Sequence, residues 1–553
     1  MPAARPRLAR NDTGPHPADP RTAHGTLRRH NDVAPGAGTG DLAHARAISF
    51  AVPPDDENPG LTGSSDRPRR DLVTGSARSS TGAVRTAAEH PGGKGPGMPR
   101  HRWFGLTTAL LLAAALAACS AGGGSASADA EAGALGRELA APVAPPDTSR
   151  TPIVFLHGNL GSGEQFESQA QRFASNGYPA DRITALDHDA SSSTVTEGPV
   201  FARLDGEIQR LLTLAGTKQV DLVAHAEGAD LGQRYLASSP ARAARVAHLI
   251  SVDGPQTLRT PKGVHTLVVW GAGDPTRRVA GADNVRFLEA DRGQLLGAAA
   301  TFRQMYRFLT GTDPFTDDVT PQRGPIDISG RALLYPANAG LGGARLEVYR
   351  LDPKTGRRLP NGLAGLFTLP ADGSWGPLRA DGTAYYEFAI VRAGEPVHHF
   401  YFEPFRRGDR LVRLLTSRPG GEIGGGMEVS PRQTDLVIDR DLEWWGDQGA
   451  GSDVLTVDGA NVLSAATAPR TKMTRQLFVF DRGADGASDI ATPIPAYFGI
   501  GFITGVDRFI PAGDRSFEVT QTPRGRAAHR TTLRVPALPS TTDRMTLRLR
   551  DDD

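Results

Sequence analysis

The segment Leu-Val-Ala-His-Ala-Glu-Gly at residues 222–228 has the spacing of a nucleophile elbow, a strand-to-helix turn of the Gly-x-Ser-x-Gly type. In such a turn the central serine presents its hydroxyl for attack on a carbonyl carbon, and small flanking residues let the turn close. Ala224 and Gly228 supply the small flanks, but Ala226 stands at the centre. Because a methyl group cannot attack a carbonyl, this segment predicts the turn without its nucleophile.

The elements that would position this turn are strands alternating with helices between residues 151 and 318. Apolar runs predict strands at 152–156, 182–186, 219–224, 246–252, 266–270 and 284–288. Helical periodicity predicts helices at 164–176, 200–215, from residue 227 onward and at 298–309. Strands that alternate with helices in this way favour a doubly wound, mostly parallel sheet.

This order, with His157-Gly158-Asn159 after the first strand and the elbow after the third, resembles the α/β-hydrolase family. More narrowly, the chain is similar to small secreted bacterial and archaeal lipases whose hydrolase domain precedes β-sandwich domains of a lipid-binding type. The resemblance covers roughly residues 150–553. It is most specific at residues 155–162 and 219–228. Residues 253–265 are too few to hold a large cap domain, so any cleft should be shallow and open.

The resemblance also implies where the rest of a catalytic triad should stand. It places the acid at Asp274, after the strand at 266–270, and a histidine where this chain has Arg292. It places the oxyanion hole at the backbone N–H groups of Asn159 and Glu227. Asp274 could instead be an ordinary turn aspartate, and Arg292 could pair with Asp274 or be an exposed loop arginine.

No neighbouring side chain is an obvious substitute for the missing groups. His225 and His157 are interpreted as structural, and Glu227 stands one residue too late to serve as a carboxylate nucleophile. Loss of the serine or of the histidine of such a triad costs a factor of about 10^6 in turnover. We therefore expect a catalytically degenerate lipase/esterase-like protein that acts by binding lipid or another surface ligand. The alternatives are a carboxylic-ester hydrolase (lipase) with non-standard residues and a product of a decaying gene.

Beyond residue 318 short alternating segments separated by turn residues predict two β-rich units, at 325–415 and 430–553. The first resembles transthyretin-like sandwiches. Two apolar, aromatic stretches, at 398–405 and 497–503, could face a membrane or form buried strands. The pair His398-His399 lacks further ligands at zinc spacing, and residues 481–489 lack the alternating ligands of a calcium loop. We expect no metal and no cofactor.

The N-terminal part of the chain has a different character. Residues 1–97 lack apolar periodicity and predict disorder, whereas residues 98–119 combine a basic start with an apolar run of about fifteen residues, too short to span a bilayer. The ending Leu-Ala-Ala-Cys at Cys119 resembles the lipobox of bacterial lipoproteins, and residues 120–150 read as a linker. We expect an exported protein anchored to a membrane by lipid at Cys119. A signal peptide with a chance cysteine stays open, as does translation from Met98.

The overall composition excludes one class of partner. Lys and Arg total 62 against 61 Asp and Glu, for a formal net charge of +1 at pH 7. A chain so balanced offers no basic field for nucleic acid. Its single cysteine, Cys119, excludes an internal disulfide.

Overall fold

The computed structural model describes residues 144–192, 195–418 and 423–550, which all belong to one compact unit. The predicted disordered segment, the signal segment with Cys119 and most of the linker lie outside the described residues. Within the described part, none of the helices is both long enough and apolar enough to cross a bilayer.

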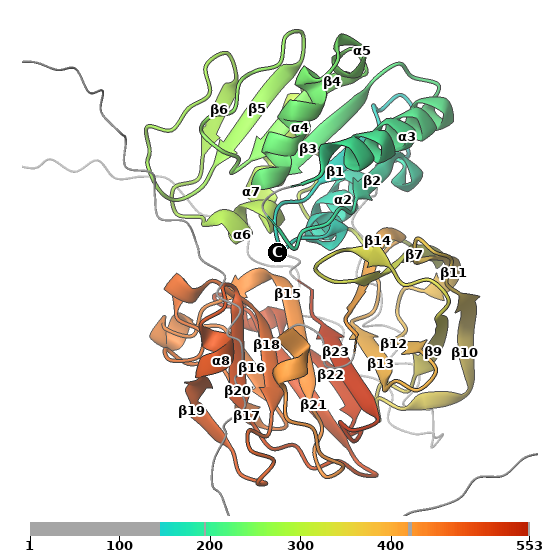
Figure 1. The fold of residues 1–553 in the computed structure, drawn as a ribbon, viewed down its shortest axis with the longest axis vertical. Coiled ribbons are helices and arrows are strands. Elements are labelled where there is room, and N and C mark those ends of the chain that lie inside the picture. The colour runs from blue at the N-terminus through green and yellow to red at the C-terminus, as the bar shows by residue number, and fades with distance from the viewer. Residues whose placement is uncertain (1–143, 193–194, 419–422, 551–553) are drawn as a thin grey trace, which may run out of the picture. The chain divides into compact units, whose positions relative to one another are not determined.

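The first part of the described chain is built on a six-stranded sheet in which every pairing is parallel. The order in the sheet is β2-β1-β3-β4-β5-β6, as Figure 1 shows. Its strands are β1 (Ile153–Leu156), β2 (Ile183–Leu186), β3 (Val220–His225), β4 (Val246–Val252), β5 (His265–Trp270) and β6 (Asp283–Arg286). The associated helices are α2 (Glu167–Ser175), α3 (Glu197–Ala215), α4 (Glu227–Ala237), α5 (Pro240–Ala243), α6 (Arg292–Gly297) and α7 (Ala299–Thr310). The predicted α/β-hydrolase fold is confirmed.

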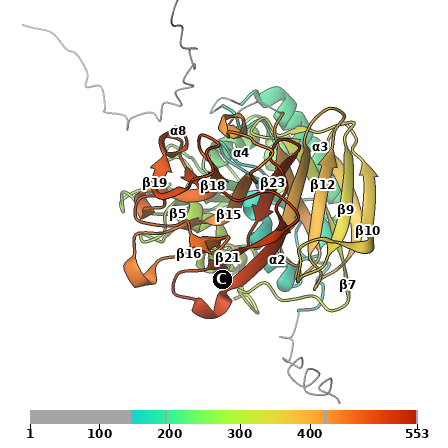
Figure 2. The same ribbon diagram turned by 90° about the horizontal axis from the view of Figure 1, so that it is seen from below.

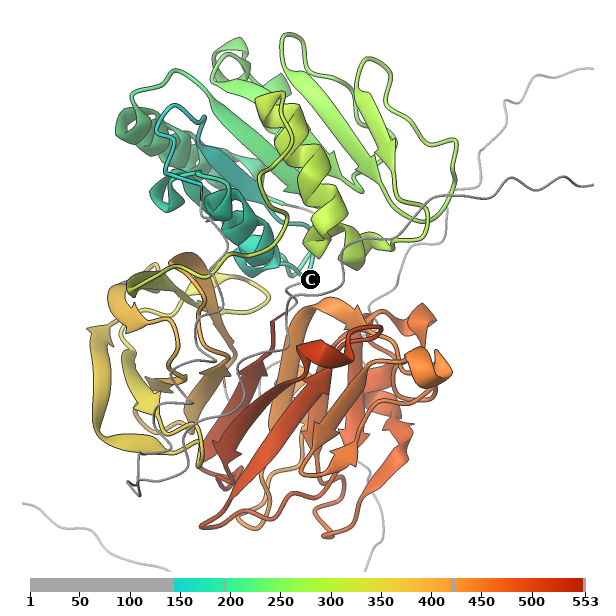
Figure 3. The ribbon, with the colours of Figure 1, turned by 180° about the vertical axis from the view of Figure 1, so that it is seen from behind.

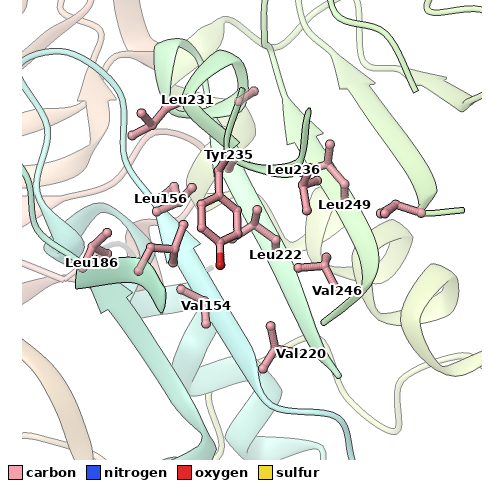
Figure 4. Packing of buried hydrophobic residues seen from close by; sticks show 14 of the residues in the cluster. Val154, Leu156, Leu186, Val220, Leu222, Leu231, Tyr235, Leu236, Val246 and Leu249 are labelled. Atoms are coloured by element: carbon pink, nitrogen blue, oxygen red, sulfur yellow. The ribbon is translucent and has the colours of Figure 1, made fainter. Parts of the chain in front are cut away.

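Both faces of this sheet are covered by helices, which explains why its strands are continuous apolar runs. On one face α3 and α4 pack against side chains such as Val154, Leu156 and Leu222 (Figure 4). On the other face, seen from behind in Figure 3, α2 and α7 pack against Ile153 and Phe155. Successive side chains of a strand point to opposite faces, so β1 contributes to both cores.

The loop between β4 and β5 contains no helix or strand at residues 253–264. No cap is inserted at this point of the fold. The carboxyl ends of the parallel strands are where ligands bind in open α/β sheets. The residues that follow β1, β3 and β4 at this edge therefore form the candidate site.

The remainder is rich in β-strands, as predicted. Its first strands are β7 (Pro325–Leu334), β8 (Ala339–Gly340), β9 (Arg345–Leu351), β10 (Arg358–Thr368), β11 (Ser374–Asp381), β12 (Tyr386–Val391), β13 (Val397–Phe402) and β14 (Asp409–Thr416). The later elements are β15 (Leu436–Trp444), β16 (Val454–Val457), β17 (Ala460–Asn461), β18 (Thr474–Phe480), β19 (Asp489–Ile494), α8 (Pro495–Phe498), β20 (Ile503–Asp507), β21 (Ser516–Thr522), β22 (Thr531–Pro536) and β23 (Asp543–Arg548). The aromatic stretch at 398–405 contributes the buried strand β13.

The β-sandwich architecture predicted for this part is confirmed, and the two β-rich units share one large sheet. A nine-stranded sheet runs in the order β10-β9-β12-β13-β23-β15-β18-β20-β19, and the parallel pair β13 and β23 joins the units. Figure 2 shows β23 next to the strands of the first unit. At this seam His399 lies between two carboxylates, with Nδ1 2.6 Å from Glu387 and Nε2 2.8 Å from Asp543. Two further four-stranded sheets pack against the large one.

Buried contacts between arginines and acidic side chains tie the hydrolase-like part to both β-rich units. Arg413 of β14 contacts both carboxylate oxygens of Asp187, which follows β2, at 3.1 and 3.0 Å. Arg548 of β23 contacts Glu164 at 2.9 Å, and it also pairs with Asp439 and Asp441 of β15. These side chains are at most 18% exposed. Burying such charged groups costs a large desolvation energy. Removing one partner then destabilises the fold strongly, because the other charge is left buried without a counter-charge.

Candidate functional site

The elbow at the end of β3 has a strained backbone, and alanine stands at its apex. The backbone of Ala226 has φ +50° and ψ −122°. Residues other than glycine rarely adopt this conformation, which costs of the order of 1–3 kcal/mol. A Cβ atom on Gly228 would lie 2.5 Å from the carbonyl oxygen of His157 and 2.6 Å from that of Leu156. Only glycine therefore allows α4 to start this close to β1. The predicted elbow geometry is present, with a buried methyl group at its apex.

The sheet register places a carboxylate directly beside this apex. Val252, the last residue of β4, pairs with His225, the last residue of β3, so the next residues, Asp253 and Ala226, emerge side by side. The backbone N–H of Ala226 donates to Val252 O at 3.0 Å. Asp253 is buried and also has a positive φ of 44°. Sequence analysis did not single out Asp253, because nothing in the local pattern distinguishes it from any aspartate after a strand.

Arg292 forms its ion pair with Asp253 and not with Asp274. Its Nε donates to Asp253 Oδ2 at 2.9 Å, and Arg277 Nη1 lies 3.2 Å from the other oxygen of the same carboxylate. Arg292 is the first residue of α6, where the Asp291 side chain caps the helix by accepting from the N–H of Gln294 at 3.0 Å. A guanidinium stays protonated near neutrality and cannot accept a proton, so Arg292 cannot act as a general base.

Asp274, which the family resemblance assigns as the acid, lies in an exposed turn. Its Oδ1 accepts from the backbone N–H of Thr276 at 2.8 Å and from the Thr276 hydroxyl at 2.7 Å. The side-chain and backbone hydrogen bonds of Thr276 hold the pKa of Asp274 below its usual value. Among the described residues its hydrogen-bond partners are therefore those of a turn aspartate, the alternative that the sequence left open.

The oxyanion-hole residues predicted from the sequence do meet in the structure, but in an unexpected way. The backbone N–H of Asn159, in the loop after β1, donates to Oε2 of the Glu227 side chain at 3.2 Å. Glu227 is the first residue of α4, so its own carboxylate lies on the donor intended for an acyl oxygen. That these two backbone N–H groups form an oxyanion hole stays a prediction, and the sequence gave no sign that the Glu227 side chain would accept from the Asn159 N–H.

The loop that carries Asn159 is held from both sides. His157 is fully buried, with Nδ1 2.9 Å from Gly158 O, and its Nε2 accepts from the N–H of His188 at 3.1 Å. Burial, and then the neighbouring His188, lower the pKa of His157 to about 3, so the ring is neutral. From the first β-rich unit, Tyr335 donates its hydroxyl to Leu160 O and Asn338 donates to Gly161 O, each at 2.8 Å. These last two residues were missed because they are distant in sequence.

His225 precedes the apex and is not a partner for any nucleophile. It is 6% exposed, and neither ring nitrogen has a hydrogen-bond partner among the described residues. Burial, followed by the charges of Arg292 and Arg475, lowers its pKa to about 3. Of the nearby serines, Ser162 caps the turn at Gly163–Phe166 and Ser251 is buried in β4.

The second β-rich unit contacts the rim of this site next to Arg292. Arg470 donates to Glu289 O at 3.0 Å, and Glu443 at the end of β15 is fully buried beside Gly293 of α6. Burial, and then the adjacent Asp291, raise the pKa of Glu443 to about 9, so this carboxyl is neutral at pH 7. Within the described ranges, no group of three His, Cys, Asp or Glu side chains is arranged to hold a metal ion.

Comparison with known families agrees with this architecture. A family model of class 2 lipases matches residues 150–243, a model of the lipase C-terminal domain matches residues 324–419, and a further C-terminal domain model matches residues 422–553. These matches support a lipase-like family with C-terminal β domains. The lipase match ends at residue 243, before Asp253, Asp274 and Arg292, so it covers the elbow and the Asn159 loop alone.

Several solved structures are similar to part of this lipase-like chain. One is the mature lipase of Bacillus licheniformis, with 16% identity, covering 31% of this chain and 96% of that chain at a TM-score of 0.24. Another is a CIB-like hydrolase from Thermoplasma acidophilum, with 17% identity over 30% of this chain and 89% of that chain at a TM-score of 0.23. A probable hydrolytic enzyme from Pseudomonas aeruginosa has 15% identity, 31% and 88% coverage and a TM-score of 0.24.

Proposed function

We propose that this lipase-like protein binds an acyl lipid or a related surface ligand without hydrolysing it. The observation that carries the proposal is the apex of the elbow, where Ala226 keeps the strained backbone of a nucleophile and has no attacking atom. The family resemblance expects the base at Arg292, and this arginine is paired with Asp253. Loss of either group alone costs a factor of about 10^6 in turnover, because nucleophile and base act as a unit.

Three structural features of the site support an acyl lipid as the class of ligand. The oxyanion loop is anchored by buried hydrogen bonds, the elbow holds its geometry, and no helix or strand covers the segment after β4. Such a scaffold can orient an ester or acid group at the carboxyl edge of the sheet.

The absence of hydrolysis is tested with a fluorophosphonate probe and a short-chain nitrophenyl ester. We expect no covalent adduct by intact-mass analysis and no ester turnover above a heat-denatured control. An adduct on any residue of the folded protein, or turnover that is abolished by changing Glu227 or Asp253, would replace the binding proposal with a hydrolase that uses non-standard residues.

We further propose that the protein acts at a membrane surface, held by acyl chains on Cys119. The support is the sequence of residues 98–119, and two or more long acyl chains are needed for stable anchoring. Metabolic labelling with a radioactive fatty acid should label the wild-type chain and not the Cys119→Ala variant. Equal labelling of the two would show that Cys119 carries no lipid.

A further inference from the structure

The carboxylate of Glu227 lies inside the remnant oxyanion hole. Its Oε2 accepts from the N–H of Asn159 at 3.2 Å, and it lies 2.9 Å from the point where a Cβ on Gly158 would stand. The same point is 3.1 Å from the methyl group of Ala226. The carboxylate therefore lies near the apex of the elbow, on a backbone donor that would hold an acyl oxygen in a hydrolase.

Two features make this position favourable for a carboxylate. Glu227 begins the eleven-residue helix α4, whose N-terminal N–H groups and dipole stabilise negative charge. Hydrogen bonds to a carboxylate are roughly twice as strong as those to a neutral oxygen such as an ester carbonyl. The donors of this site therefore favour an acid over an ester.

A second, independent feature is the buried imidazole next to the apex. His225 is only 6% exposed, and neither of its ring nitrogens has a hydrogen-bond partner in the described part of the chain. In the sheet register His225 pairs with Val252, the residue before Asp253, so His225 lies beside the Asp253–Arg292 pair. Arg292 keeps a side chain that is 48% exposed, so part of its guanidinium remains open to a ligand. The site thus contains unsatisfied polar capacity beside an accessible cation.

We propose that the remnant oxyanion hole is a carboxylate subsite, occupied from within by Glu227, for which the free carboxylate of a fatty acid competes. This inference rests on the proposed function, since it names the chemical class of the ligand of the same site. Glu227 is exposed, so its carboxylate can turn into water when a ligand enters. While it stays nearby, its negative charge opposes the ligand. Glu227 therefore limits the affinity of the native chain for acids.

The experiment measures binding of decanoate and of methyl decanoate to the full chain, below their aggregation concentrations, by calorimetry. Removal of the side chain in Glu227→Ala should tighten decanoate binding at least tenfold and change methyl decanoate binding less than threefold. Adding Arg292→Ala should reverse most of the gain for decanoate. Glu197, the first residue of α3, is a matched helix-start carboxylate away from the elbow, and Glu197→Ala should leave both affinities unchanged.

Selective 15N labelling of asparagine gives a readout at the site itself, because the Asn159 amide signal should move when decanoate binds. If methyl decanoate binds but Glu227→Ala leaves decanoate affinity unchanged, the carboxylate subsite is refuted while the proposed function stands. If neither compound binds any variant, each folded by circular dichroism, the proposed function fails and the subsite fails with it.

Discussion

Rebuilding the triad tests which carboxylate occupies the acid position. The perturbation is Ala226→Ser with Arg292→His, in a Glu227→Ala background that frees the Asn159 N–H. The backbone at residue 226 already carries a Cβ at φ +50°, so serine adds a single oxygen. Because nucleophile and base act as a unit, Ala226→Ser alone should change ester turnover less than tenfold. The combined variant should exceed it by roughly 10^3-fold or more, out of the full factor of about 10^6.

The acid is then identified by removing each candidate from the rebuilt variant. Asp253 contacts residue 292 at 2.9 Å, whereas Asp274 bonds to Thr276 in an exposed turn. Asp253→Asn should lower kcat on nitrophenyl butyrate by about 10^4, or about 5 kcal/mol, since an amide stabilises the wrong tautomer. Asp274→Asn should have less than a threefold effect. The opposite ranking, or no gain in the rebuilt variant, would refute the assignment of Asp253 and Arg292 to a single site.

Three further predictions concern stability, measured as apparent unfolding midpoints. Arg548→Met leaves Glu164, Asp439 and Asp441 without their buried counter-charge and should cost about 3–5 kcal/mol at pH 9. The loss should shrink at pH 5, because burial raises the pKa of Glu164 to about 8 and the acid is then neutral; an equal loss at both pH values would contradict this. Although burial alone would raise it, hydrogen bonds from Arg358 and His399 lower the pKa of Glu387 to about 2. Its stabilisation is present above pH 4.5 and is lost as the pH falls toward 2, so Glu387→Gln should flatten that decline. Burial raises the pKa of Glu443 to about 9 in the folded protein. The contribution of Glu443 to the free energy of unfolding is therefore fully present below pH 4.5 and is lost as the pH rises toward 9. Glu443→Gln should flatten the alkaline decline, and an unchanged profile would show that this carboxyl is ionised in the fold.

Much of the hydrolase fold could be predicted from the sequence because its signals are local. The apolar run at 152–156 predicted β1, and the helical period at 200–215 predicted α3, which begins three residues earlier in the structure. The β-rich units were also predicted from turns and alternation. Their union in one sheet was not, because the pairing of β13 with β23 joins residues about 145 positions apart and leaves no local mark.

The sequence by itself determined which atoms residues 226 and 292 can offer. The Ala226 side chain has no nucleophilic atom, and the Arg292 guanidinium stays protonated near neutrality, so neither side chain can take the role that the family resemblance expects at its position. It also determined the elbow, since Gly228 leaves room for the close backbone contact with Leu156 and His157.

Only the tertiary structure decided which groups meet. Strand register set Asp253 beside Ala226 and gave Arg292 to that carboxylate, and the start of α4 directed the Glu227 side chain onto the Asn159 N–H. It also brought Tyr335 and Asn338 from a later unit to the same loop. The physical reason is that side-chain pairing depends on distances across strands and between units, and these are fixed by packing of the whole fold rather than by neighbours in the chain.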